Sequence, residues 1–427
     1  MATAVFSVAD ICRAAKRASR ALARLDSDVK DAALEAIAVA LKERRGEILQ
    51  ANERDMQAGR ENEIGDALLD RLRLDEQRVL AIAAAVRQIA ALADPVGELI
   101  DGRRLPNGLD VRKVRVPLGV VAVVYEARPN VTIDAAALCV KSGNAIVLRG
   151  SSSAQHSNAA LAQIAADAAV EAGLPPGCVS LVAGGGREEL AELATQRDSV
   201  DLIIPRGGEG LKDALQAVAT VPVIYAASGN CHVYVDAAAE LDQAEAIVLN
   251  SKTQRPGVCN AAETLLVHED AAPLFLPPIV GALQDAGVLV RADERALAIV
   301  EDARAPGAAF VQAAGEQDWS TEYLAMTIAV RVVESVDAAI EHIGRYGSGH
   351  SEAIVTRDTA AARAFQLGVD AACVYVNAST RFTDGGEFGM GAEIGNSTQK
   401  LHVRGPIGLR ELCTFKYLVE GDGHVRA

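Results

Sequence analysis

Short apolar runs alternate with helical segments along the middle of the chain, and this order limits the fold more than any other feature. The runs Val120–Tyr125 and Ala145–Leu148 are typical of buried strands, and an alanine-rich helix is predicted over residues 157–172. Further strands are predicted at Val179–Ala183 and Asp201–Ile204. Strands that alternate with helices form a parallel sheet with helices on both faces. We therefore predict a doubly wound α/β domain whose ligands bind at the carboxyl ends of the strands.

The segments on either side of this series have patterns of their own. Apolar residues recur at helical spacing from residue 8 to about 98, and Asp26–Asp28 offers an N-cap for a second helix. Gly108–Val116 alternates apolar and polar residues like an exposed strand. Other strands are predicted at Pro222–Tyr225, His232–Val235, Glu263–His268, Ile328–Val333, Glu352–Val355 and Val374–Asn377, with helices at residues 187–196, 211–220, 274–286 and 335–345. The later elements predict a second α/β unit, followed by a glycine-rich ordered loop and an extended segment at residues 409–419.

The composition is that of an ordinary globular protein with an excess of acidic residues. Half of the 427 residues are hydrophobic and 23% are charged, which suffices for two or three domains. The net charge of −15 disfavours nucleic acid and anionic membranes as partners, and no apolar run is long enough to span a bilayer. Seven cysteines without paired spacing indicate the reducing cytoplasm. The seven histidines lack metal-ligand spacing, so no metal site is expected.

One cysteine has surroundings that favour chemistry over burial. The segment Lys252–Asn260 places Cys259 directly after a Pro-Gly turn, with Arg255 close by. Nearby positive charge stabilises a thiolate, and a turn can present the sulfur at a cleft. Free cysteines are more often buried as small apolar side chains, and the other six here lie in or beside apolar runs or in the first helical segment. We interpret Cys259 as an activated nucleophile for an electrophilic carbon, with burial as the alternative.

Three predicted strands end in polar segments that can bind ligands. Ile203–Gly210 leads into a helix, whose first backbone N–H groups can accept a phosphate. Arg149–Ser153 combines a cation with hydroxyls that can hold the phosphate of an adenosine ribose. Tyr125–Asn130 ends in an amide that can donate to an oxyanion. Each segment also has a structural interpretation: a plain strand–helix turn, an N-cap and a turn asparagine, respectively.

Several motifs in a fixed order carry a resemblance to a known family. They are PLGVVAVVYEARPNVTIDAAALCVKSGNAIVLRG from Pro117, DLIIPRGG from Asp201, GNCHVYVD from Gly229, KTQRPGVCNAAETLLVH from Lys252, TEYLA from Thr321 and GAEIGNSTQKLHVRGPIGL from Gly391. With them the chain resembles the aldehyde dehydrogenase superfamily and, within it, the γ-glutamyl phosphate reductases, over about residues 8–420. The resemblance implies NADPH-dependent reduction of L-glutamate 5-phosphate to L-glutamate 5-semialdehyde and phosphate through a cysteine thioester, in proline biosynthesis.

The resemblance also assigns roles to residues that match the motifs. It implies that Cys259 is the nucleophile and that Asn130, with the Cys259 amide, holds the oxyanion. NADP binding is expected at Arg149, Ser151, Ser152, Arg206, Gly207, Gly208, Ser228, Gly229 and Glu322. An anionic substrate must overcome the acidic net charge, and the candidates for binding it are Arg128, Lys252, Arg255 and Lys400.

The chain departs from the family pattern at three places. Hydrolytic aldehyde dehydrogenases carry a general-base glutamate where this chain has Ala227–Cys231, so no obvious group activates water against a thioester. That absence suits an enzyme whose thioester meets phosphate or hydride. Met326 stands where a proline is expected, and Ser153 lies near the place of an expected glutamate; both affect local cofactor contacts rather than the reaction. The alternatives are another reductive or CoA-acylating aldehyde dehydrogenase and a non-catalytic member of the family.

The architecture implied by the resemblance has three parts. They are a Rossmann-type NADP-binding domain (1–107 and 124–252), an α/β catalytic domain (253–378) and a small β oligomerisation hairpin (108–123 and 396–427). An exposed edge strand at residues 111–116 can pair with a second subunit, so a homo-oligomer, dimer or tetramer, is expected. A complex with glutamate 5-kinase is left open.

Overall fold

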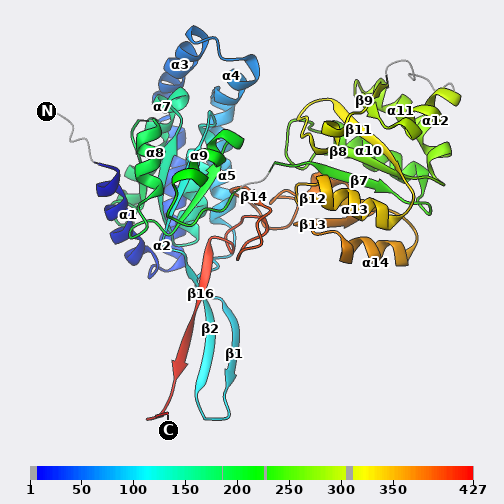
Figure 1. Ribbon diagram of the computed structural model, residues 1–427. Coiled ribbons are helices and arrows are strands. Elements are labelled where there is room, and N and C mark those ends of the chain that lie inside the picture. Colours follow the sequence, from blue (N-terminus) through cyan, green and yellow to red (C-terminus); the bar gives the residue numbers. More distant parts are fainter. Residues whose placement is uncertain (1–6, 185, 226–227, 304–310, 427) are drawn as a thin grey trace. The chain divides into compact units, whose positions relative to one another are not determined.

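The computed structural model describes residues 7–184, 186–225, 228–303 and 311–426 of the chain (Figure 1). The chain divides into two compact units. Unit 1 contains residues 1–226, 389–395 and 407–427, and unit 2 contains residues 227–388 and 396–406. Each unit has its own parallel sheet.

A four-stranded parallel sheet forms the centre of unit 1. Its strands are β3 (Val120–Tyr125), β4 (Ala145–Gly150), β5 (Val179–Leu181) and β6 (Leu202–Arg206), in the order β5-β4-β3-β6. All residues of β3 and β4 are buried, as expected for apolar strands covered on both faces. The chain runs outward from β3 to β4 and β5 and then crosses to β6 on the other side of β3. Such a reversal of strand order creates a ligand-binding crevice at the carboxyl ends of the strands.

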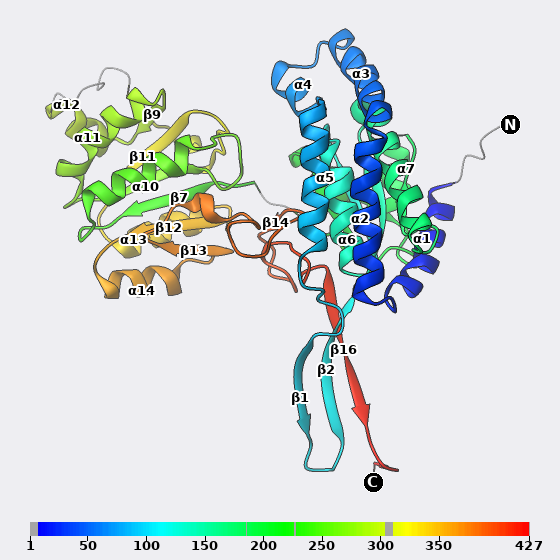
Figure 2. The same ribbon diagram turned by 180° about the vertical axis from the view of Figure 1, so that it is seen from behind.

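Helices cover both faces of this sheet. They are α1 (Val8–Leu22), α2 (Ser27–Glu43), α3 (Arg45–Glu61), α4 (Asp66–Leu72), α5 (Glu76–Ala90), α6 (Asn130–Lys141), α7 (Gln155–Glu171), α8 (Arg187–Ala194) and α9 (Glu209–Val218). Figure 2 shows α6 and α7 on one face with α2 and α5 packed outside them, and α1 contacts α8 on the other face. Asp26 is the N-cap residue of α2, as predicted, although its side chain accepts no capping hydrogen bond.

Unit 1 also carries a small antiparallel sheet of three strands. They are β1 (Leu99–Arg104), β2 (Asp110–Pro117) and β16 (Cys413–Glu420), in the order β1-β2-β16. The pairs run from Asp110 opposite Glu420 to Pro117 opposite Cys413. This sheet joins residues 110–117 and 413–420 of the segments expected to form the oligomerisation hairpin. Residues 120–123 belong instead to β3 in the central sheet, and residues 396–406 belong to unit 2. The strand β2, expected as an exposed edge strand, lies in the middle of the small sheet.

Unit 2 is built on a seven-stranded parallel sheet with the order β10-β9-β11-β8-β7-β12-β13. Its strands are β7 (Cys231–Val235), β8 (Ala262–His268), β9 (Leu289–Ala292), β10 (Gln312–Ala313), β11 (Thr327–Val333), β12 (Ser351–Val355) and β13 (Cys373–Val376). The helices are α10 (Leu241–Thr253), α11 (Ala272–Asp285), α12 (Glu294–Asp302), α13 (Val336–Tyr346) and α14 (Thr359–Gly368), with 3₁₀ turns η3 (Glu316–Ser320) and η4 (Thr380–Phe382). A short pair, β14 (Asn396–Ser397) and β15 (Gly405–Pro406), completes the unit.

Alternating side chains of the strands build two cores in unit 2. Val233 and Val235 of β7 pack with α10, α11 and α12, whereas Tyr234 between them packs with α13 and α14. Leu265 and Leu266 of β8 divide in the same way. This is the expected geometry of a strand, in which successive side chains point to opposite faces.

The structure differs from the sequence predictions in some elements. Pro222–Tyr225 is not a strand; it makes a single bridge, between Val223 and Ile203. The strands β1, β9 and β10 and the helices α6, α10, α12 and α14 were not predicted. The division between the compact units falls at residues 226/227, whereas the sequence analysis placed the domain boundary at 252/253. The reason is that β7 pairs with β8 and β12, which brings α10 into unit 2.

Candidate active site

Cys259 lies in the loop that connects α10 to β8. Its side chain is partly exposed, whereas the other six cysteines are buried. Burial raises the pKa of the thiols of Cys12, Cys139, Cys178, Cys231 and Cys413. Those thiols stay protonated at neutral pH and are poor nucleophiles. The pattern of burial supports the interpretation of Cys259 as the reactive cysteine.

The loop before β7 packs tightly against Cys259. A Cβ atom on Gly229 would lie 1.5 Å from the Cys259 carbonyl oxygen, so a side chain cannot be accommodated there without moving the Cys259 backbone. The Cys231 thiol donates to the same carbonyl oxygen at 3.2 Å. These contacts fix the backbone that carries the candidate nucleophile.

Glu322 meets this loop from a third segment. Its carboxylate accepts a hydrogen bond from the Gly229 N–H at 2.6 Å. Leu324, two residues later, has a φ of 50°, a left-handed conformation that bulky residues rarely adopt. Its N–H donates to Glu263 of β8 at 3.2 Å, which helps to hold the strained turn. Glu322, Gly229 and Cys259 are therefore brought together in unit 2.

A buried ion pair connects the start of this loop to β8. The Lys252 ammonium and the Glu263 carboxylate are 2.5 Å apart, and both side chains are completely buried. Burial lowers the pKa of Lys252 and raises that of Glu263 to about 7, because desolvation outweighs the attraction between the charges. Lys252, a candidate contact for the substrate, thus has a protein partner and no exposed surface.

Sequence reasoning missed Arg381, which holds the other side of the Cys259 loop. Its guanidinium donates from Nε to Gln254 at 2.8 Å and from Nη1 to the side-chain oxygen of Asn260. Burial lowers the pKa of Arg381, followed by repulsion from Arg255, whereas Cys259 raises it. The guanidinium groups of Arg255 and Arg381 therefore both contribute positive charge to the Cys259 loop. Arg381 lies far along the chain, at the start of a glycine-rich stretch, and no local pattern connects it with Cys259.

In unit 1, the expected cofactor residues lie at the carboxyl edge of the sheet. Tyr125, the last residue of β3, is paired with Gly150 of β4 and Arg206 of β6. Arg149 is buried and donates to the Gly186 carbonyl at 2.6 Å. The Arg149, Ser151, Ser152 and Arg206–Gly208 positions are brought to one edge, where the doubly wound fold binds ligands.

The start of α9 already binds an anionic group. Gly208, its N-cap residue, donates its N–H to the Glu126 carboxylate at 3.1 Å. A Cβ atom on Gly207 would lie 2.7 Å from the Glu126 carboxyl carbon, so a residue with a side chain does not fit there without displacing Glu126. The Glu126 carboxylate occupies the position that an oxyanion of a ligand would take at this helix N-terminus.

Asn130 begins α6 and belongs to unit 1. Its side-chain amide donates to Asp134 at 2.9 Å, one helical turn later. Burial raises the pKa of Asp134 to about 6. Cys259 belongs to unit 2, so the expectation that Asn130 faces its sulfur stays a prediction.

The remaining predicted substrate cations have different surroundings. Arg255 is exposed in the Cys259 loop, and Arg128 is partly exposed after β3. Lys400 forms an ion pair with Asp370, which also binds Arg404 at 2.8 Å. Ser228 precedes Gly229 in the loop against Cys259, and Ala227, the position that lacks a general-base glutamate, lies outside the described residues.

The described part of the chain contains no group of three or more His, Cys, Asp or Glu side chains arranged to hold a metal ion. Within the same residues, none of the helices has both the length and the apolar character required to cross a membrane.

Comparison with known proteins decides the family. The aldehyde dehydrogenase family model matches residues 2–298, which is more than half of the chain. The chain belongs to the aldehyde dehydrogenase family. A protein of Moorella thermoacetica named γ-glutamyl phosphate reductase is 54% identical over 412 residues, which cover 96% of this chain and 97% of the relative. One of Thermobifida fusca with the same name is 54% identical over 420 residues, covering 98% and 99%.

A solved structure agrees with these relatives. The crystal structure of γ-glutamyl phosphate reductase from Thermotoga maritima superimposes with a TM-score of 0.95 at 46% identity and covers 99% of this chain and 100% of that one. The predicted fold, an aldehyde dehydrogenase-like α/β protein with a small antiparallel sheet, is confirmed. Membership of this family also implies a nicotinamide cofactor.

Proposed function

We propose that this enzyme reduces L-glutamate 5-phosphate to L-glutamate 5-semialdehyde and phosphate with NADPH, the second step of proline biosynthesis from glutamate. The relatives that cover nearly the whole chain are named for this reaction. The single structural observation that carries the proposal is the partly exposed Cys259, whose loop is held by contacts with Gly229 and Arg381.

The first step transfers the acyl group to sulfur. The Cys259 thiolate attacks the acyl-phosphate carbonyl carbon, a C–S bond forms, and the negative charge moves to the carbonyl oxygen. We assign the stabilisation of this oxyanion to the Asn130 amide and the Cys259 N–H. Collapse of the intermediate breaks the bond to the phosphate oxygen, and phosphate leaves without needing a strong general acid. The product of this step is a thioester on Cys259.

Residues of unit 1 suit a nicotinamide dinucleotide. The Gly208 N–H at the start of α9 donates a hydrogen bond to the Glu126 carboxylate, and a phosphate group can take the place of that carboxylate. Arg149, with Ser151 and Ser152, supplies a cation and hydroxyls for a ribose 2′-phosphate, which supports NADP over NAD. When bound, the reduced cofactor supplies the hydride that converts the thioester to the aldehyde level. Cys259 then leaves as thiolate and releases the semialdehyde.

The charged groups near Cys259 fit an anionic substrate. Arg255 is exposed and, after burial, contributes to lowering the pKa of Arg381, so this pair is the candidate for the phosphate or carboxylate of the substrate. Arg128 and Lys400 remain further candidates. Lys252 cannot contact the substrate directly, because its ammonium is fully buried and paired with Glu263.

The reverse reaction provides the test. Glutamate 5-semialdehyde, NADP and phosphate are expected to give NADPH in a phosphate-dependent manner, measured by absorbance. Replacing phosphate with coenzyme A distinguishes the alternative, an acylating dehydrogenase. Equal or faster NADPH formation with coenzyme A and none with phosphate would reject the proposed reaction. The variant Cys178→Ser serves as a matched control for Cys259→Ser, since Cys178 is buried in unit 1.

The small antiparallel sheet supports a homo-oligomer. Its outer strand β16 exposes a row of large apolar side chains: Phe415, Tyr417, Leu418 and Val419. An exposed apolar strand at a sheet edge is a surface that proteins usually cover. We propose that a second copy covers it; light scattering after size-exclusion chromatography is expected to give a dimer or tetramer, and a monomer would refute this.

A further inference from the structure

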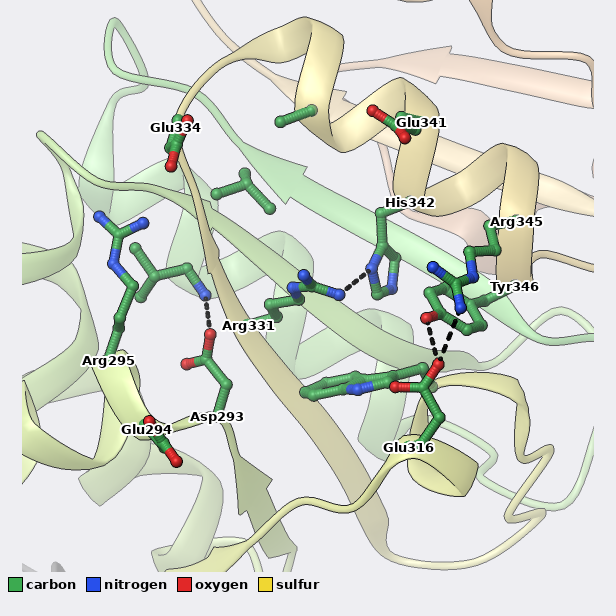
Figure 3. A pocket seen from close by; sticks show the side chains of 14 residues that line it. Asp293, Glu294, Arg295, Glu316, Arg331, Glu334, Glu341, His342, Arg345 and Tyr346 are labelled. Atoms are coloured by element: carbon green, nitrogen blue, oxygen red, sulfur yellow. Dashed lines mark hydrogen bonds and ion pairs between the residues drawn. The ribbon is translucent and has the colours of Figure 1, made fainter.

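Unit 2 contains a cavity of about 700 Å³ that none of the proposed active-site residues line. It lies beside the carboxyl ends of β9 and β11, with η3 and α13 forming the other walls (Figure 3). Its lining mixes both charges: Asp293, Glu294, Glu316, Glu334 and Glu341 against Arg295, Arg331 and Arg345. Trp319 supplies an aromatic surface.

Arg331 is the central residue of this cavity. Its Nη1 donates to His342 Nδ1 at 3.1 Å, and its guanidinium lies 5.5 Å from the centre of the Trp319 ring. Although five carboxylates line the same cavity, Arg331 forms no ion pair with any residue that the structure describes. Figure 3 shows the side chain reaching into the middle of the cavity. Burial raises the pKa of Asp293 and the charge of Arg331 opposes this rise, but no described carboxylate is within ion-pair distance of the guanidinium, which leaves it available to an external anion.

His342 fixes the position of Arg331 without neutralising its charge. Burial lowers the pKa of His342 to about 3, so its ring is neutral. Because Nδ1 accepts the hydrogen bond from Arg331, the ring proton is on Nε2. The ring also contacts Trp319 and Tyr346, which holds it in place.

The acidic residues of the cavity fall into two groups. Glu316 is occupied by Arg345 and the Tyr346 hydroxyl, and Asp293 accepts the N–H groups at the start of α12 and in β11. Glu334 and Glu341, by contrast, make no ion pair within the described residues; Glu341 lies on α13 and Glu334 just before it (Figure 3). A ligand that satisfies Arg331 therefore also meets two unpaired carboxylates.

We propose that this cavity binds a small α-amino acid as a zwitterion. The ligand carboxylate pairs with Arg331, its ammonium group pairs with Glu334 or Glu341, and an apolar side chain lies on Trp319. A phosphate fits worse, because it has no positively charged group to pair with Glu334 or Glu341. A simple cation would leave Arg331 unpaired.

The cavity has a direct mechanical link to the candidate active site. The carbonyl oxygens of Trp319 and Tyr346 accept hydrogen bonds from the Asn230 side chain at 2.7 and 2.8 Å. Asn230 follows Gly229, whose N–H binds Glu322. A ligand that fixes Trp319 and Tyr346 also fixes the loop behind Cys259, so binding is expected to alter the steady-state rate.

Isothermal titration calorimetry of the full chain tests the proposal without substrate or cofactor. The probes are glycine, L-alanine, L-proline, L-leucine and L-phenylalanine at millimolar concentration, with the N-acetyl acids and the amides as matched ligands. At least one free amino acid is expected to bind, and loss of either charged group of that ligand should weaken binding at least about tenfold. Because this measurement does not use the reductase reaction, its failure would leave the proposed function standing.

Variants identify the site. Arg331→Met is expected to weaken binding at least about tenfold, and so is the double variant Glu334→Gln/Glu341→Gln, whose exposed positions tolerate substitution. Arg345→Met is the matched control in the same cavity, since this arginine already pairs with Glu316, and its affinity should stay within about twofold of wild type. No binding by any probe, or unchanged affinity in both the Arg331 and the glutamate variants, overturns the proposal.

Discussion

The buried Lys252–Glu263 pair makes a quantitative prediction for the variant Lys252→Met. Removing the ammonium leaves Glu263 fully buried with one remaining hydrogen bond, from the Leu324 N–H. A lone carboxylate in such a place takes up a proton. In the wild type the pKa of Glu263 is already raised from 4.5 to about 7, so only a further rise in the variant separates the two proteins, at about 1.36 kcal/mol for each pKa unit.

The same reasoning fixes the sign of the pH dependence. Up to about pH 7 both folded proteins keep a proton on Glu263 that the unfolded state loses above its ordinary pKa. Above pH 7 the wild type can ionise Glu263 beside Lys252, whereas the variant keeps the proton. The stability of the variant relative to wild type therefore falls above pH 7, by up to about 1.4 kcal/mol per unit and to about 2–3 kcal/mol at pH 9. The double variant Lys252→Met/Glu263→Gln should recover most of this loss at pH 9, because it buries no charge.

Urea unfolding followed by tryptophan fluorescence measures these differences. Trp319 is the single tryptophan of the chain and lies in unit 2 with the ion pair, so the signal reports on the correct unit. Arg357→Met is a control, since this exposed arginine forms only a surface pair with Glu240. A Lys252→Met penalty that is equal at pH 7 and pH 9, or a double variant as unstable as the single one at pH 9, would refute this account of the ion pair.

Three other substitutions test the candidate site. Gly229→Ala should reduce kcat/KM at least about a hundredfold by displacing Cys259, while far-UV circular dichroism stays near wild type; normal activity would mean that the close approach is not needed. Arg381→Met should raise KM for the acyl phosphate about tenfold or more, and an effect on the KM for NADPH alone would argue against substrate binding. Asn130→Ala should lower kcat by about 10²–10³ with little change in KM, and an unchanged kcat would remove Asn130 from the oxyanion site.

The apolar pattern of the sequence predicts the strands that are buried on both faces. Val120–Tyr125 and Ala145–Leu148 are recognisable because covered parallel strands need continuous apolar residues. The helix α10 escapes prediction because it combines a weak apolar pattern with no capping side chain. Pro222–Tyr225 resembles a strand by composition, yet its backbone pairs only once with the sheet.

In the candidate site, too, the sequence could indicate residues close to Cys259 along the chain but not those brought to it by folding. The Pro-Gly turn before Cys259 is local, and it led to the one cysteine that is not buried. Lys252 is also close to Cys259 in sequence, but this proximity could not reveal that its ammonium is buried against Glu263. Arg381 reaches the Cys259 loop only through the folding of unit 2, so its role needed the structure.

The central claim is that Cys259 carries the acyl group. Its most direct test is mass spectrometry of the enzyme quenched in acid after mixing with L-glutamate 5-phosphate in the absence of NADPH. The account predicts a glutamyl adduct on the peptide that contains Cys259, which disappears when NADPH is added and is absent from Cys259→Ala. Reduction of the acyl phosphate by Cys259→Ala at near the wild-type rate, with no adduct on the wild-type enzyme, would contradict it.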